Sequence, residues 1–185
     1  MIQLKENIFL ETISINKDKN ELYDLIVTDH KNLIYSYDQY NFKLDDQYKE
    51  FTEDLYSKFL SFCESLFGKL ELLEQNKRDC WAYVSNKDSI ECVVHNHLRT
   101  AVLNGVYYLN IPDENSGSLD FFDDNMNIIY THYPKESELL LFPPYLLHKP
   151  NMNYSDKYRI AINVEIICNL KNIEKFVKKQ AYAEY

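Results

Sequence analysis

The chain has 185 residues, 45% of them hydrophobic, which suits one folded domain and excludes wholesale disorder. Its 29 acidic and 20 basic residues give a formal net charge of -9, which disfavours broad binding to nucleic-acid phosphates. No stretch reaches the roughly 20 apolar residues of a membrane helix, and the N-terminus lacks the pattern of a signal peptide. We therefore expect a cytoplasmic protein, in the host cytoplasm if it is viral, with no membrane partner.

Cysteine and glycine usage narrows the function classes further. Cys63, Cys80, Cys92 and Cys168 are widely spaced and contain no C-x-x-C pair, so we expect reduced thiols and exclude a zinc ribbon. Only three glycines are present, so no phosphate-binding glycine loop can be drawn. The common nucleotide-binding folds are thereby disfavoured.

The first third of the chain predicts one strand followed by helices. Residues 7–15 alternate well enough for a strand, and Asn16 or Asp18 can cap a helix over residues 19–30. Residues 46–76 carry apolar side chains at helical spacing, which indicates a helix that faces the core.

From Trp81 onward the pattern changes to short strands separated by turn residues. Many short strands at regular spacing indicate a sandwich, a barrel or a jelly roll, and residues 169–182 predict a closing helix. We expect a mainly β fold, a double-stranded β-helix (jelly roll) with flanking helices. Its strands are expected at 81–85, 91–95, 105–111, 118–122, 127–131, 138–142 and 158–167.

Three of the five histidines form a pattern that is typical of a metal site. His95 and His97 point the same way if they lie on a strand, and His148 from a distant strand can complete one side of a metal. Imidazole suits iron, copper, nickel and zinc, and three protein ligands leave open coordination positions. The ligand types alone do not choose between a zinc site and a non-haem iron site.

Arg159 adds a second chemical requirement. It begins an apolar run, and Arg159, Ala161 and Asn163 share one face of the predicted strand. A guanidinium inside a barrel is costly unless it meets a carboxylate, which its fork can bind through two hydrogen bonds. A dicarboxylate co-substrate that chelates the metal at one end and meets Arg159 at the other satisfies both requirements.

These elements resemble, in order, the Fe(II)/2-oxoglutarate-dependent dioxygenases. The resemblance is to the prolyl-hydroxylase-like branch and to oxygenases often found in phage and marine bacterial genomes, and it covers roughly residues 81–167. The matching segments are Val94 to His97, Gly105 to Asn110, Ser116 to Phe121, Glu138 to Pro143 with the later His148, and Arg159 to Asn163.

The resemblance implies Fe(II) and 2-oxoglutarate as cofactors of a dioxygenase, a hydroxylase of an unidentified substrate. It places the metal on His95, His97 and His148, and 2-oxoglutarate on Tyr108 and Arg159 with Asn163 in support. No catalytic residue beyond the metal site is required, because the cofactors carry the chemistry. The partners are then 2-oxoglutarate, dioxygen and a protein side chain or small metabolite as substrate.

The length of the chain and the absence of a linker or repeat predict one oxygenase-like domain over residues 1–185. Within it, residues 1–80 form an N-terminal strand with supporting helices, residues 81–167 the jelly-roll core and residues 168–185 a C-terminal helix. Two other functions stay open: a cupin-like metalloenzyme that does not use 2-oxoglutarate, and a non-catalytic jelly-roll module of a binding or viral structural protein.

The chain departs from the family at His97, where most members carry Asp or Glu. Three neutral ligands leave the site one negative charge short. Asp120 is the carboxylate that we expect to compensate if one does so. His132 is expected to be exposed or to support the site indirectly.

Overall fold

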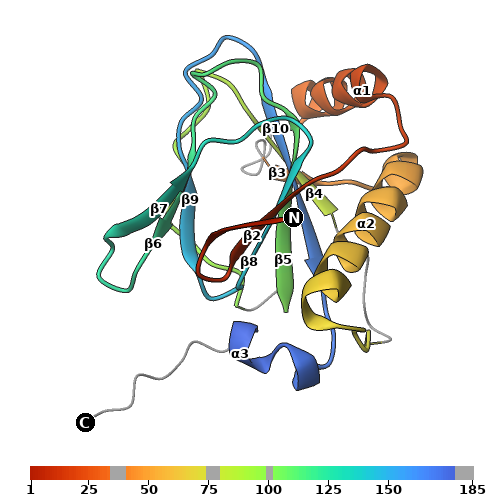
Figure 1. The fold of residues 1–185 in the computed structure, drawn as a ribbon. Coiled ribbons are helices and arrows are strands. Elements are labelled where there is room, and N and C mark those ends of the chain that lie inside the picture. The colour runs from red at the N-terminus through yellow and green to blue at the C-terminus, as the bar shows by residue number, and fades with distance from the viewer. Residues whose placement is uncertain (34–40, 74–79, 99–101, 178–185) are drawn as a thin grey trace.

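The computed structural model describes residues 1–33, 41–73, 80–98 and 102–177, and its architecture confirms the predicted β fold. The strands in these ranges pair antiparallel throughout. They are β1 (Ile2–Lys5), β2 (Ile8–Thr12), β3 (Asn41–Lys43), β4 (Cys80–Ser85), β5 (Leu103–Asn110), β6 (Leu119–Phe122), β7 (Ile128–His132), β8 (Glu138–Phe142), β9 (Leu147–Pro150) and β10 (Arg159–Ile166). The larger sheet has the order β1-β2-β8-β5-β10-β4-β3, and the smaller has the order β7-β6-β9 (Figure 1).

The two long helices, α1 (Lys19–Asn32) and α2 (Lys49–Phe67), lie on one side of the larger sheet (Figure 1). Asp18 caps α1 as predicted, because its Oδ1 accepts the backbone N–H groups of Asn20 and Glu21 at 2.9 Å. A 3₁₀ turn (Asp46–Tyr48) leads into α2.

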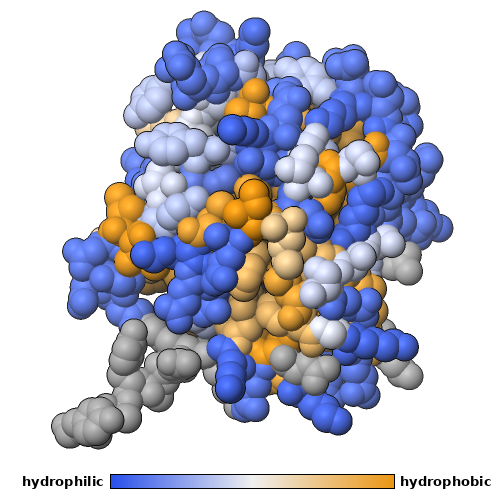
Figure 2. Space-filling view, viewed as in Figure 1, coloured by the Kyte–Doolittle hydropathy of each residue, from blue (hydrophilic) through white to orange (hydrophobic). Residues whose placement is uncertain are grey.

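The closing helix expected over residues 169–182 is confirmed for only four residues of the described ranges. A 3₁₀ turn (Leu170–Asn172) precedes the four-residue helix α3 (Glu174–Val177), and residues 178–182 lie outside the described ranges. Figure 2 shows hydrophobic surface in the area between α2 and α3. The rings of Phe9 and Phe67 contact Phe176 of α3 at centroid distances of 6.2 and 4.9 Å. No helix within the described ranges is long and apolar enough to cross a membrane.

Each central strand divides its side chains between two cores. On β5, Tyr107 faces the helices, 6.4 Å from Phe51, whereas Tyr108 belongs to the core between the sheets. Gly105 allows α2 to approach, because a Cβ there would lie 2.6 Å from a ring carbon of Phe59. The core between the sheets consists of Ile8, Leu10, Val106, Tyr108, Leu119, Phe121, Leu140, Phe142 and Ala161. Burial of each large apolar side chain contributes about 1.5 to 3 kcal/mol.

Several strands differ from the prediction. Residues 91–95 do not form a strand, and β1, β3 and β9 were not expected. His95 instead makes an isolated bridge to His148. This bridge fixes the position of the histidine pair.

Candidate metal centre

His148 stands on β9 and faces the interior between the two sheets. It is 3% exposed, and its ring packs against Phe142 and Phe121 at centroid distances of 4.8 and 6.2 Å. Phe121 is the direct partner of His148 in the β6–β9 ladder, so both side chains leave the sheet on the same side. The apolar rings on this side keep the imidazole buried and restrict its rotation.

The segment that carries His95 and His97 is held against β9 by backbone hydrogen bonds. The N–H of His95 donates to the carbonyl of His148 at 3.0 Å, and the reverse bond measures 2.9 Å. The N–H of His97 donates to the carbonyl of Pro144 at 2.8 Å. The pair therefore faces His148 although its segment is not a strand, which corrects the assumption from which the pairing was predicted.

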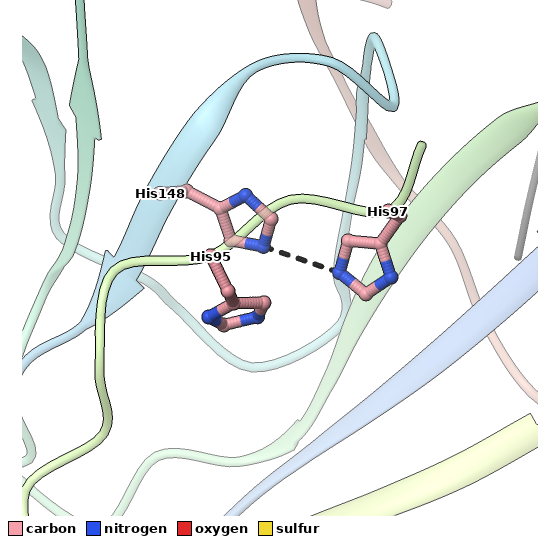
Figure 3. Close-up of side chains that lie close together, drawn as sticks. All are labelled: His95, His97 and His148. Carbon is pink, nitrogen blue, oxygen red and sulfur yellow. Dashed lines mark hydrogen bonds between the residues drawn. The ribbon is translucent and has the colours of Figure 1, made fainter. Parts of the chain in front are cut away.

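The three imidazoles converge on one point (Figure 3). One nitrogen from each of His95, His97 and His148 lies within 4.8 Å of the others. The Nε2 atoms of His97 and His148 are 3.3 Å apart, and their rings are nearly parallel, with an interplanar angle of 11°. The sequence prediction thus named the three side chains that the fold brings together.

The hydrogen bonds of the Nδ1 atoms fix the tautomer of each ring. Nδ1 of His95 lies 2.9 Å from the carbonyl of Val93, and Nδ1 of His148 lies 2.8 Å from that of Leu146. A carbonyl only accepts, so each Nδ1 must carry the proton, and Nε2 is left with a lone pair. This arrangement is typical of metal-binding histidines.

The third ring is held by a carboxylate. Nδ1 of His97 lies 3.0 Å from Oε1 of Glu165, which is buried on β10. The same reasoning assigns the proton to Nδ1 of His97 and the lone pair to Nε2. All three histidines therefore present an Nε2 lone pair.

Burial keeps two of the three imidazoles, those of His95 and His148, neutral. Desolvation, helped by the neighbouring His95, lowers the pKa of His148 to about 3. Burial also lowers the pKa of His95. Both imidazoles are thus neutral at pH 7, with a proton on Nδ1 and none on Nε2. This is the form that binds a metal.

Sequence reasoning missed Glu165 and favoured Asp120 instead. Asp120 accepts hydrogen bonds from Thr131 at 2.7 Å and from Asn151 at 2.7 Å, and it does not belong to the histidine cluster. Glu165 lies two residues after Asn163, and so it follows the alternation that places Arg159 on the inner face of β10. The alternation of residues 159, 161 and 163, continued to residue 165, is the sequence pattern that predicts an inward-facing Glu165.

A cavity of about 250 Å³ joins the histidines to the predicted co-substrate residues. Its walls also include Tyr83, Cys92, Val106 and Ala161. Tyr108, Arg159 and Asn163, which were expected to bind 2-oxoglutarate, all line it. Burial raises the pKa of Tyr108, so its phenol stays protonated.

Arg159 is buried, and only part of its guanidinium group is hydrogen-bonded. It is 2% exposed, and its Nη1 donates to the carbonyl of Ser116 at 2.9 Å. Its Nε and Nη2 are buried without an acceptor among the described residues, and the guanidinium carbon lies 5.6 Å from the centre of the Tyr83 ring. Burial lowers the pKa of Arg159. A guanidinium in this state calls for an anionic ligand.

Gly117 makes the position of Arg159 possible. Its φ is +80°, in the region that favours glycine. A Cβ there would lie 2.4 Å from the carbonyl oxygen of Met152 and 2.9 Å from Nη1 of Arg159. Any side chain at this position would collide with both.

His132 is not exposed, contrary to one of the two roles expected for it. It is 4% exposed, and its Nε2 lies 3.0 Å from Oε2 of Glu138. Its ring centroid is 5.9 Å from that of Tyr108, so it packs behind a residue that lines the cavity.

Comparison with solved structures finds the same architecture in prolyl hydroxylases. A prolyl 4-hydroxylase from Phytophthora capsici aligns with a TM-score of 0.61 at 13% identity, over 85% of this chain and 57% of that one. A Trichoplax adhaerens prolyl hydroxylase, in complex with a hypoxia inducible factor peptide, aligns at 0.63 and 14% identity, over 87% and 83%. The 2-oxoglutarate complex of a viral collagen prolyl hydroxylase from Paramecium bursaria Chlorella virus-1 aligns at 0.51 and 17%, over 88% and 96%.

The chain has the prolyl hydroxylase fold. A scan against protein-family models and a search among curated protein sequences both find no match. The likeness to the prolyl hydroxylases is therefore one of structure, and at these identities it establishes the fold.

Proposed function

We propose that this protein is an Fe(II)- and 2-oxoglutarate-dependent dioxygenase that hydroxylates its substrate. One observation carries the proposal. A single cavity is lined by three imidazoles that present lone pairs and by a buried guanidinium with unused N–H donors. The prolyl hydroxylase fold, which includes a 2-oxoglutarate-bound member, supports it.

The spacing of His97 and His148 fits two ligands of a divalent transition metal. Ligands held about 2.1 Å from a metal lie about 3.0 to 3.4 Å apart at octahedral or tetrahedral angles. The Nε2 atoms of His97 and His148 are 3.3 Å apart, within that range. We infer that His95, His97 and His148 hold the iron through Nε2.

The remaining polar groups of the cavity fit 2-oxoglutarate. We infer that Nε and Nη2 of Arg159 donate to its distal carboxylate, while Nη1 stays on Ser116 and fixes the direction of the fork. Tyr108 keeps its phenolic proton and can donate to the same ligand. Asn163 lies on the same face of β10 and supports the polar end of the cavity.

When bound, iron and 2-oxoglutarate supply the oxidising chemistry for substrate hydroxylation. The chain itself binds, orients and excludes water. Phe121, Phe142 and Val106 form an apolar wall beside the histidines, which strengthens each polar contact inside. We propose that residues 1–185 act as one domain, with a protein side chain or a small metabolite as substrate.

The test is turnover of 2-oxoglutarate. Purified protein given Fe(II), ascorbate and 2-oxoglutarate in air should form succinate, and Arg159→Ala should lose this activity while it keeps the metal. Metal-dependent turnover of a substrate that survives Arg159→Ala would favour a cupin-like enzyme without 2-oxoglutarate. Failure to bind any divalent metal would favour a non-catalytic module.

A further inference from the structure

Glu165 is a buried acid in contact with a proposed metal ligand. It is 6% exposed, and its Oε1 lies 3.0 Å from Nδ1 of His97. It stands on the inner face of β10, opposite Asn104 of β5 in the ladder. Burial of an unpaired carboxylate destabilises the fold, so the contact with His97 offsets part of the cost of burying Glu165.

The contact distinguishes His97 from the other two histidines. Nδ1 of His95 and Nδ1 of His148 bond to neutral backbone carbonyls. A hydrogen bond to a carboxylate is stronger than one to a carbonyl, and it draws the Nδ1 proton away from the ring. Of the three rings, His97 alone is therefore polarised by a charged partner at Nδ1.

The carboxylate of Glu165 changes the total charge of the metal site. Two neutral histidines with one carboxylate ligand carry a charge of about -1, whereas three neutral histidines carry none. With Glu165 included, the present site returns to about -1. The negative charge thus lies on Glu165, which contacts the ligand His97, and not on a ligand itself.

We propose that Glu165 is a positioning residue that acts through His97 and supplies the negative charge by which this site retains a divalent metal. The proposal rests on the metal site of the proposed function. It explains how the chain carries a histidine where the family it resembles carries an acid. It does not depend on 2-oxoglutarate or on turnover.

The experiment is an anaerobic titration of the metal-free protein with Co(II), followed by its visible absorption. Glu165→Gln keeps the shape and an acceptor oxygen but removes the charge. We expect it to weaken Co(II) binding by about 10- to 100-fold and to shift the absorption bands, because a partner behind a ligand has effects of this size. Asp120→Asn is the matched control, since it neutralises another buried acid that lies outside the cluster. It should bind Co(II) within about threefold of the wild type.

A double variant tests the charge itself. His97→Asp combined with Glu165→Gln returns one carboxylate to the site, now as a ligand, and should bind Co(II) at least tenfold more tightly than Glu165→Gln alone. If Glu165→Gln fails to fold, the double variant is compared with the wild type instead. Affinity within about tenfold then supports the proposal, and a loss of about 100-fold overturns it.

The outcomes separate this proposal from the function. Wild-type affinity and spectrum in folded Glu165→Gln overturn the role of Glu165 and leave the proposed function standing. A protein that binds Co(II) in the expected pattern but never turns over 2-oxoglutarate overturns the function and leaves the role of Glu165. A wild-type protein that binds no Co(II) overturns both.

Discussion

Nε2 of His97 and Nε2 of His148 face each other at 3.3 Å, and both are lone-pair acceptors. Each Nε2 has a lone pair because the proton of its ring is on Nδ1. The Nδ1 of His97 donates to Glu165, and the Nδ1 of His148 donates to a backbone carbonyl. Two lone pairs at this distance repel each other unless a cation or a proton lies between them. The fold thus holds an arrangement that a bound metal would stabilise.

Removal of His148 should abolish metal binding. We expect His148→Ala to weaken Co(II) binding by more than about 100-fold, which exceeds the usual effect of losing an indirect partner. The measurement is a titration monitored by absorption, with circular dichroism as the check on folding.

His132→Gln is the control for that experiment. His132 is also buried, but it bonds to Glu138 outside the cluster, and glutamine can retain that hydrogen bond. Its Co(II) affinity should equal that of the wild type. Equal losses in the two variants would show that the histidine cluster does not form the metal site.

Arg159 should determine affinity for 2-oxoglutarate and not for the metal. Hydrogen bonds to charged groups are worth about 1.5 to 3 kcal/mol, so Arg159→Gln should weaken 2-oxoglutarate binding by about 10- to 100-fold. Calorimetric titration of the Co(II)-loaded protein measures this effect.

Arg159→Lys separates charge from geometry. It keeps the positive charge but loses the planar fork, so its affinity should fall between those of Arg159→Gln and the wild type. If all three proteins bind 2-oxoglutarate equally, the co-substrate does not contact Arg159.

Gly117 should be intolerant of any side chain. We expect Gly117→Ala to lower the free energy of unfolding by more than about 3 kcal/mol, because the steric collision adds to the 1 to 3 kcal/mol of an unfavourable backbone conformation. Gly68→Ala is the control: φ is +77° there as well, but no atom lies within 4 Å of the added Cβ. Urea unfolding compares the two, and a larger loss in Gly68→Ala would contradict the packing described around Arg159.

Stability without metal should fall as the pH falls below 6.5. The pKa of His148 is about 3 in the folded chain and 6.5 when it is exposed, so below pH 6.5 the unfolded chain binds a proton that the folded chain does not. The contribution of His148 to the free energy of unfolding is then constant above pH 6.5, and it decreases toward pH 3 by up to about 1.4 kcal/mol per pH unit. The lowered pKa of His95 acts in the same direction.

Urea unfolding in a chelator between pH 7.5 and 5 measures this dependence. His148→Gln should show a shallower decrease, because one of the responsible groups is gone. A decrease as steep as in the wild type would show that His148 does not take up a proton when the chain unfolds.

Local patterns were enough to predict β5 and β10, two of the strands that carry the cavity. The alternation along β10 places Arg159 and Asn163 on one face, and the structure puts both in the cavity wall. On β5 the same rule predicts that only one of Tyr107 and Tyr108 faces inward. Period-two alternation is a property of single strands, and it needs no knowledge of the partners.

Features that depend on distant partners could not be predicted in this way. The segment of His95 and His97 has no strand of its own, and hydrogen bonds to His148 and Pro144 fix its place. Strand β9 is short and ends at Pro150, so it carries little local signal. The partner of His97 is decided by which carboxylate the fold brings within reach, and that carboxylate is Glu165 and not Asp120.

The most direct test of the proposed function is an anaerobic titration of the metal-free protein with Fe(II) and 2-oxoglutarate. We expect one equivalent of each to produce a visible charge-transfer band that neither ligand produces alone. His148→Ala should abolish the band, and Arg159→Gln should require about 10- to 100-fold more 2-oxoglutarate to reach it. Tight binding of Fe(II) without any band upon addition of 2-oxoglutarate would contradict the proposed function.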